Sequence, residues 1–152
     1  MQNKFLSYDY DFLVINNIEL DHVDFFKNIS DIYDSFIKAS ERSKCLIINE
    51  DIDIEHNNKY TFGKKETSFS RFKIINETEE GYILDLKVGD INEIVRFPFC
   101  GEHMIYNMLA ALTVLYLNDK IININDVIRN MSLPKKRMEV TYIKGNTVVT
   151  DY

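Results

Sequence analysis

The chain has 152 residues, of which 45% are hydrophobic and 28% are charged, as in an ordinary globular domain. It carries 18 Lys and Arg against 24 Asp and Glu, and this net charge of −6 argues against a nucleic-acid binder, which is normally basic. No apolar run approaches the roughly 20 residues of a membrane span. The two cysteines, Cys45 and Cys100, lack any metal-binding spacing. We therefore expect one reduced, cytoplasmic domain that binds neither nucleic acid nor membrane.

The first half of the sequence predicts a βαβ unit. Residues 10–18 form an apolar run typical of a central parallel strand, and residues 44–49 form a second, shorter one. Between them, Ser30 is placed to cap a helix whose apolar positions recur at spacings of three and four through Ser40. Strand, helix and strand in this order predict parallel neighbours joined by a right-handed crossover.

The second half changes its pattern. Three segments alternate between polar and apolar residues and predict a small antiparallel sheet, with a tight turn at Gly89-Asp90: 69–76, 82–88 and 91–98. His103 to Leu117 is apolar nearly all round and predicts a buried helix. A short helix capped at Asn125-Asp126 and running through Met131 follows, and residues 138–151 predict a hairpin turning at Gly145-Asn146. The fold class is thus α/β: part of a parallel sheet with flanking helices, plus a small antiparallel sheet.

The stretch Phe12 to Phe26, FLVINNIELDHVDFF, places Glu19 and three further polar residues, Asp21, His22 and Asp24, directly after the first strand. Ligands of open α/β sheets bind at the carboxyl ends of the strands. Carboxylates that orient one ring nitrogen of His22 would prepare the other for a metal, and oxygen-rich surroundings favour Mg²⁺ or Mn²⁺. The alternative is a histidine hydrogen-bonded at a helix start for structural reasons alone.

His103 and Asn107 share one helix face, because four residues separate them. They are the only strongly polar groups of an otherwise apolar helix, and burying an unpaired amide costs roughly 1–3 kcal/mol. One interpretation is a hydrogen bond to a neighbouring loop. The other is a helix start that presents polar groups to a nucleotide base or phosphate.

The basic run Lys135-Lys136-Arg137 is either a solvated loop or, if it faces a nucleotide, a source of planar donors from Arg137. Asp151, at a strand end, is placed to accept from sugar hydroxyls. The 152 residues contain neither G-x-x-x-x-G-K-[ST] nor G-x-G-x-x-G, and no nucleophile turn. We see no self-contained catalytic apparatus in them.

In this order the motifs resemble the central domain of the Mur ligases, the ATP-dependent amide-forming enzymes that build the peptide of bacterial peptidoglycan. Four segments carry the resemblance: Asn17-Ile18-Glu19-Leu20-Asp21-His22 to N-I-E-x-D-H, Gly101-Glu102-His103-Met104-Ile105-Tyr106-Asn107-Met108-Leu109-Ala110-Ala111 to G-x-H-N-x-x-N-x-x-A-A, Lys136-Arg137-Met138-Glu139 to R-R-x-E, and Asp151-Tyr152 to the first half of D-Y-A-H. The first segment, the following Phe25-Phe26 and the final Asp-Tyr are most similar to the UDP-N-acetylmuramate–L-alanine ligase branch.

The resemblance implies a role for each matched position. His22 would ligate a magnesium ion, Asn107 would contact the adenine of ATP, and His103 would support the helix start. Arg137 and Asp151 would approach the ribose and phosphates. The implied reaction forms an acyl-phosphate from ATP and the carboxylate of a UDP-sugar, and the amine of an amino acid, L-alanine in this branch, then attacks it.

Two departures qualify this expectation. Met104 stands where the family has its first helix asparagine, and the family's phosphate loop and UDP-binding domain precede the matched region. We expect residues 1–134 to be a partial central domain without the phosphate loop, and 135–152 a hinge hairpin toward a C-terminal domain. Such a chain should be inactive alone and should form a homodimer through exposed sheet edges.

Two other interpretations stay open. A non-catalytic interaction module, or a truncated gene product, would keep the fold without the chemistry. Another enzyme of the same superfamily, such as a folate-polyglutamate or cyanophycin-type ligase, would keep the chemistry with a different substrate.

Overall fold

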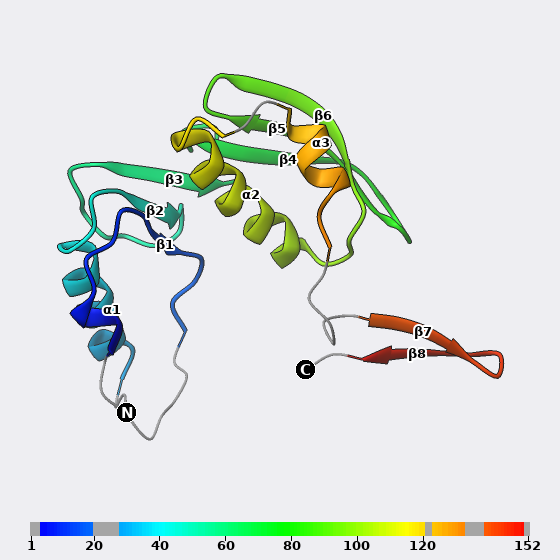
Figure 1. The fold of residues 1–152 in the computed structure, drawn as a ribbon, viewed down its shortest axis with the longest axis horizontal. Coiled ribbons are helices and arrows are strands. Elements are labelled where there is room, and N and C mark those ends of the chain that lie inside the picture. The colour runs from blue at the N-terminus through cyan, green and yellow to red at the C-terminus, as the bar shows by residue number, and fades with distance from the viewer. Residues whose placement is uncertain (1–3, 20–27, 121–122, 133–138, 151–152) are drawn as a thin grey trace.

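The computed structural model describes residues 4–19, 28–120, 123–132 and 139–150 (Figure 1). A 3-10 turn, Lys4–Ser7, comes before a six-stranded mixed sheet of order β1-β2-β3-β4-β5-β6, and a separate two-stranded hairpin follows. The strands of the sheet are β1 Leu13–Ile15, β2 Leu46–Asn49, β3 Lys59–Gly63, β4 Ser70–Thr78, β5 Gly81–Val88 and β6 Ile91–Phe97. The predicted fold class is confirmed.

The sheet is parallel from β1 to β4 and antiparallel from β4 to β6. The parallel and antiparallel parts are joined through β3, a strand that was not predicted. Its pairing with β4 covers two positions, Phe62 opposite Ser70 and Gly63 opposite Arg71. The turn at Gly89-Asp90 is confirmed, since Val88 pairs with Ile91 and Gly89 has a φ of 61°.

The first strand is shorter than the predicted 10–18. Tyr10 makes only an isolated bridge to Ser43, and the ladder to β2 covers the three residues of β1. Within the described residues β1 has a neighbour on one side only, and Val14 is 38% exposed, so the prediction of a central strand is wrong for this part of the chain. Self-association through this free edge stays a prediction.

The N-cap residues of two helices, α1 and α3, lie two residues earlier than predicted. Helix α1, Ile29–Ser40, is capped by Asn28, whose Oδ1 accepts from the Asp31 amide at 3.0 Å, and not by Ser30. Helix α3, Ile124–Arg129, is capped by Asn123 in the same way. Asparagine and serine are comparable N-caps, so sequence alone does not decide between neighbouring candidates.

Helix α2, Glu102–Leu117, confirms the helix predicted from His103, but it is not buried all round. Ile105, Leu109 and Leu112 are buried toward the sheet, whereas Asn107 and Ala111 are exposed. Among the described residues, no helix is long and apolar enough to cross a membrane.

Two apolar clusters lie on opposite faces of the parallel strands. Leu46 and Ile48 of β2 pack with Phe36 of α1, whereas Cys45 and Ile47 belong to the larger cluster under α2. In that larger cluster a buried hydrogen bond, Thr113 Oγ1 to Ser70 Oγ at 2.8 Å, joins α2 to β4. The antiparallel strands are therefore covered by α2 and α3 on one face, while α1 packs only against the parallel end.

The C-terminal hairpin consists of β7 Glu139–Ile143 and β8 Asn146–Thr150. Its turn is Lys144-Gly145, one residue before the predicted Gly145-Asn146. Both turn residues have positive φ, 49° and 80°, as a type I′ turn requires. Figure 1 shows the hairpin standing away from the six-stranded sheet.

Candidate functional site

The candidate site lies where three parallel strands end. Because β1, β2 and β3 run in the same direction, their carboxyl ends meet at one edge of the sheet. Residues that directly follow β1 and β3 contact the first two turns of α2, through Asn16 and Lys64. Figure 1 shows the first turn of α2 on the side toward which these strands point.

The end of β1 is tied to α2 by an amide pair. Asn16 Nδ2 donates to Asn107 Oδ1 at 2.7 Å. The bond leaves both N–H groups of the exposed Asn107 amide free of any protein acceptor in the described chain. Asn16 Oδ1 is buried and has no hydrogen-bond partner in the described structure. A buried acceptor without a partner is unusual and calls for a donor from solvent or ligand.

The start of α2 is shaped by Gly101. Its φ of 91° disfavours any side chain, and an added Cβ would lie 2.7 Å from Cε1 of His103. The His103 ring therefore lies over the cap and stays exposed to solvent. No side chain of the described residues caps this helix, so its first amides keep their partial positive charge toward the edge.

Lys64 connects the end of β3 to the same helix turn. Its Nζ lies 2.7 Å from Glu102 Oε1 and 5.6 Å from the centre of the Phe72 ring. The hydrogen bond with Glu102 raises the pKa of the Lys64 ammonium against the opposing effect of desolvation. Lys64 is therefore a cation at neutral pH.

Glu50, which directly follows β2, binds the loop that contains Lys64. The carboxylate of Glu50 accepts from the Lys64 amide at 2.8 Å, the Lys65 amide at 2.7 Å and the Ser68 hydroxyl at 2.6 Å. We call this arrangement the Glu50 clamp. It occupies the space beside Gly63, where an added Cβ would lie 2.2 Å from Glu50 Cδ.

Two of the predicted site residues lie at this edge. His103 and Asn107 are one turn apart and both exposed, so the supposed cost of burying them is wrong. His22, Arg137 and Asp151 lie outside the described residues, and their roles stay predictions. Across the described ranges, no three His, Cys, Asp or Glu side chains gather as a metal site would require.

Three residues of the site were not singled out from the sequence: Asn16, Glu50 and Lys64. Glu50 directly follows the predicted strand 44–49, which was an available signal, whereas Asn16 lies within the predicted strand 10–18. Lys64 directly follows β3. Because β3 was not predicted, the sequence offered no reason to expect Lys64 at this edge of the sheet.

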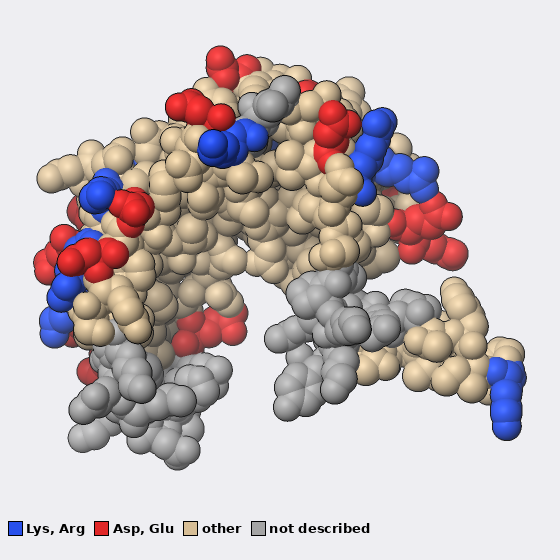
Figure 2. Space-filling model, in the orientation of Figure 1, with Lys and Arg blue, Asp and Glu red and all other residues tan. Residues whose placement is uncertain are grey.

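The face around α2 is neutral at its centre. Figure 2 shows the blue and red side chains mainly toward the margins of this view, with uncharged residues over the middle. This edge of the α/β domain thus presents amide and imidazole groups, flanked by one lysine.

Comparison with known proteins places this domain in a family. A family model described as the Mur ligase middle domain matches residues 1–115. The chain belongs to the Mur ligase family.

Solved structures share the fold. MurF from Acinetobacter baumannii matches with a TM-score of 0.81 and 17% identity, over 97% of this chain and 35% of that one. UDP-N-acetylmuramate-alanine ligase MurC from Thermotoga maritima matches with a TM-score of 0.80 and 15% identity, over 99% and 36%. MurF ligase from Thermotoga maritima in complex with ADP matches at 0.69 and 22%, over 93% and 35%. The chain thus spans about a third of the length of these proteins.

Proposed function

We propose that these residues form the adenosine-binding part of an ATP-dependent Mur-type ligase. The observation that supports this most directly is the free amide nitrogen of Asn107, held at the sheet edge by the bond from Asn16. The solved complex of a related MurF ligase with ADP supports nucleotide as the ligand class.

The chemistry of the edge suits a base and its sugar better than a chain of phosphates. Asn107 has N–H groups for a ring nitrogen of adenine, and the exposed His103 ring lies one turn away. Lys64 adds one positive charge at the margin, already shared with Glu102. The residues contain no G-x-x-x-x-G-K-[ST] loop to cradle the β- and γ-phosphates.

The complete reaction that we propose joins an amino acid, L-alanine, to the carboxylate of UDP-N-acetylmuramate through an acyl-phosphate, in cytoplasmic peptidoglycan synthesis. His22 would hold Mg²⁺, and Arg137 and Asp151 would approach the ribose and phosphates. When bound, Mg²⁺ would neutralise the charge that develops on the transferred phosphoryl group.

Asn107→Asp is the sharpest test of the adenosine site. Aspartate keeps an oxygen acceptor for Asn16 but loses the N–H donors. We expect the 152-residue chain to bind adenosine, and the substitution to weaken that binding at least about tenfold, the value of one good hydrogen bond. Titration of ¹⁵N-labelled protein with adenosine, followed by NMR, measures both affinity and location.

Asn57→Asp, an exposed amide between β2 and β3, is the matched control and should leave adenosine affinity unchanged. Equal losses in both variants, or no chemical shift change near Asn107 in the parent chain, would refute the proposed site.

A second prediction concerns turnover. The 152 residues alone should not hydrolyse ATP, because they lack groups to bind its β- and γ-phosphates. In a ligase that contains these residues, His22→Ala should abolish activity. If the 152-residue chain released phosphate from ATP and His22→Ala removed that release, the first statement would be wrong. If the full-length His22→Ala variant were active, the second would be wrong.

One observation favours the non-catalytic module as the competing function. Met104 replaces the family's first helix asparagine, and its side chain packs against the cluster under α2. If nucleotide binding has been lost, a side chain at this position is expected to pack in the apolar core and not to contact a nucleotide. Absence of adenosine binding together with a folded spectrum would favour this module.

A further inference from the structure

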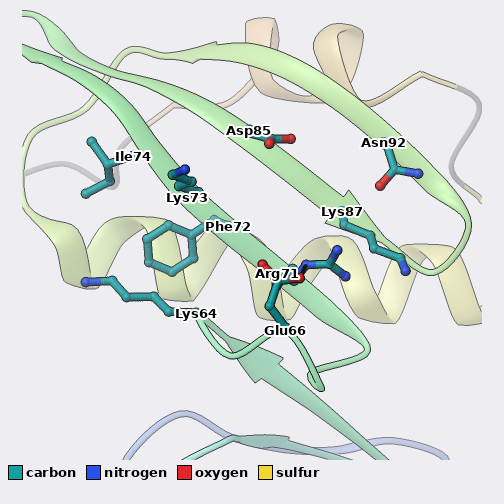
Figure 3. Close-up of a pocket in the computed structure, with 9 residues that line it drawn as sticks. All are labelled: Lys64, Glu66, Arg71, Phe72, Lys73, Ile74, Asp85, Lys87 and Asn92. Atoms are coloured by element: carbon teal, nitrogen blue, oxygen red, sulfur yellow. Dashed lines mark ion pairs between the residues drawn. The ribbon is translucent and has the colours of Figure 1, made fainter.

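A cavity of about 360 Å³ lies on the antiparallel part of the sheet, on the face that no described helix covers. Figure 3 shows its lining side chains on β4, β5 and β6 and on the loop before β4, with α2 behind the sheet. Its lining residues are Lys64, Glu66, Arg71, Phe72, Lys73, Ile74, Asp85, Lys87 and Asn92. The volume is at the lower end of the range for sites that hold small molecules.

The register concentrates cations in this cavity. Arg71 of β4 lies directly opposite Lys87 of β5, and Lys73 lies diagonal to Lys87. Like charges on directly opposed positions destabilise a sheet unless something neutralises them. Four cations line the cavity against two carboxylates, although the chain as a whole has a net charge of −6. The cluster is therefore a local feature of these strands.

The protein neutralises only part of this charge. Arg71 Nε is bound to Glu66 Oε2 at 3.0 Å, and Lys64 is bound to Glu102. Lys73 and Lys87 have neither a hydrogen bond nor an ion pair from any described residue. Two lysines from adjacent strands thus line the same cavity, and no carboxylate of the described residues is bound to either.

We propose that this cavity binds a small molecule that carries a phosphoryl group with at least two negative charges. Lys73 and Lys87 bind its oxygens, and the Arg71 guanidinium, fixed by Glu66, adds planar donors. Asn92, opposite Lys87, supplies an amide for a further oxygen of the ligand, whereas Asp85, opposite Lys73, is a carboxylate that repels it. The site differs from the proposed adenosine site: neither His103 nor Asn107 is among its lining residues, and the two sites share Lys64, which is bound to Glu102.

Inorganic pyrophosphate is the probe for a test by NMR titration of the ¹⁵N-labelled chain at low salt. We expect saturable shifts confined to β4, β5 and β6 around Lys73, Asp85 and Lys87. The double variant Lys73→Gln/Lys87→Gln should weaken binding at least tenfold. Asp85→Asn removes a repelling carboxylate and should strengthen it severalfold.

The matched control is Lys38→Gln/Lys120→Gln, which removes the same charge from two exposed lysines outside the cavity. It should change pyrophosphate affinity less than twofold, and Asn107→Asp should not change it at all. Tricarballylate, a tricarboxylate of about the same charge as pyrophosphate near neutral pH, should bind more weakly than pyrophosphate, and equal affinities would contradict a site for a phosphoryl group. Shifts scattered over the surface, or equal losses in the two double variants, would overturn the proposal.

Discussion

Phe62→Ala is expected to lower the free energy of unfolding by about 3–5 kcal/mol, the usual cost of removing a buried phenyl ring. Phe62 is fully buried and lies in β3, the strand that joins the parallel and antiparallel parts of the sheet. Its ring belongs to the cluster under α2, and its carbonyl accepts from the Glu50 amide at 3.0 Å. Urea unfolding followed by circular dichroism measures the change.

Phe62→Leu should cost less than about 1.5 kcal/mol, because it preserves most of the apolar volume. Tyr142→Ala, at a side chain that is 78% exposed, is the surface control and should stay within about 0.5 kcal/mol of the parent. If Phe62→Ala matched this control, β3 would not be the structural link that the register indicates.

Gly63→Ala is expected to lower the free energy of unfolding by about 2–3 kcal/mol, the range for losing hydrogen bonds to a charged acceptor. The new methyl group would occupy the place of Glu50 Cδ. The flexible Glu50 side chain can move aside, but the two amides and the Ser68 hydroxyl then lose their acceptor. Ser68 is only 4% exposed, so water replaces that acceptor poorly.

A double-mutant cycle isolates this effect from backbone changes at Gly63. Glu50→Ala alone should cost about as much as Gly63→Ala, because both remove the Glu50 clamp. In the Glu50→Ala background the added methyl should cost almost nothing. Additive losses would show that Gly63→Ala acts by another route, and the clamp would then not explain why glycine stands there.

The elements with a clear hydrophobic period were predictable from the sequence. α1, α2 and the strands β4 to β6 follow their expected ranges within a few residues. β3 was not predicted although its sequence, KYTFG, alternates between polar and aromatic residues, because it has only five residues and follows a run of polar residues. It becomes a strand because β2 and β4 offer it partners on both sides, which is tertiary information.

Some residues of the candidate site were also predictable from the sequence, and others were not. The spacing of His103 and Asn107 was enough to place them on one helix face. The partners of α2 depend on which strand ends lie beside its first turns, so Asn16 and Lys64 required the sheet order. The position of Glu50 after a predicted strand did not reveal its partners, because its carboxylate binds a loop that lies 14 to 18 residues further along the chain.

The mixed sheet also bears on the order in which the chain folds. β4, β5 and β6 are neighbours in sequence and are joined by tight turns, so their contacts close small loops. β1 and β2 meet only across a crossover that contains α1, which has a greater loop-closure entropy. The antiparallel strands, with the charged cavity on them, are therefore favoured to form first. The edge that carries Asn16 and Glu50 is completed later, when the parallel strands add to β4 through the two pairs at Phe62 and Gly63.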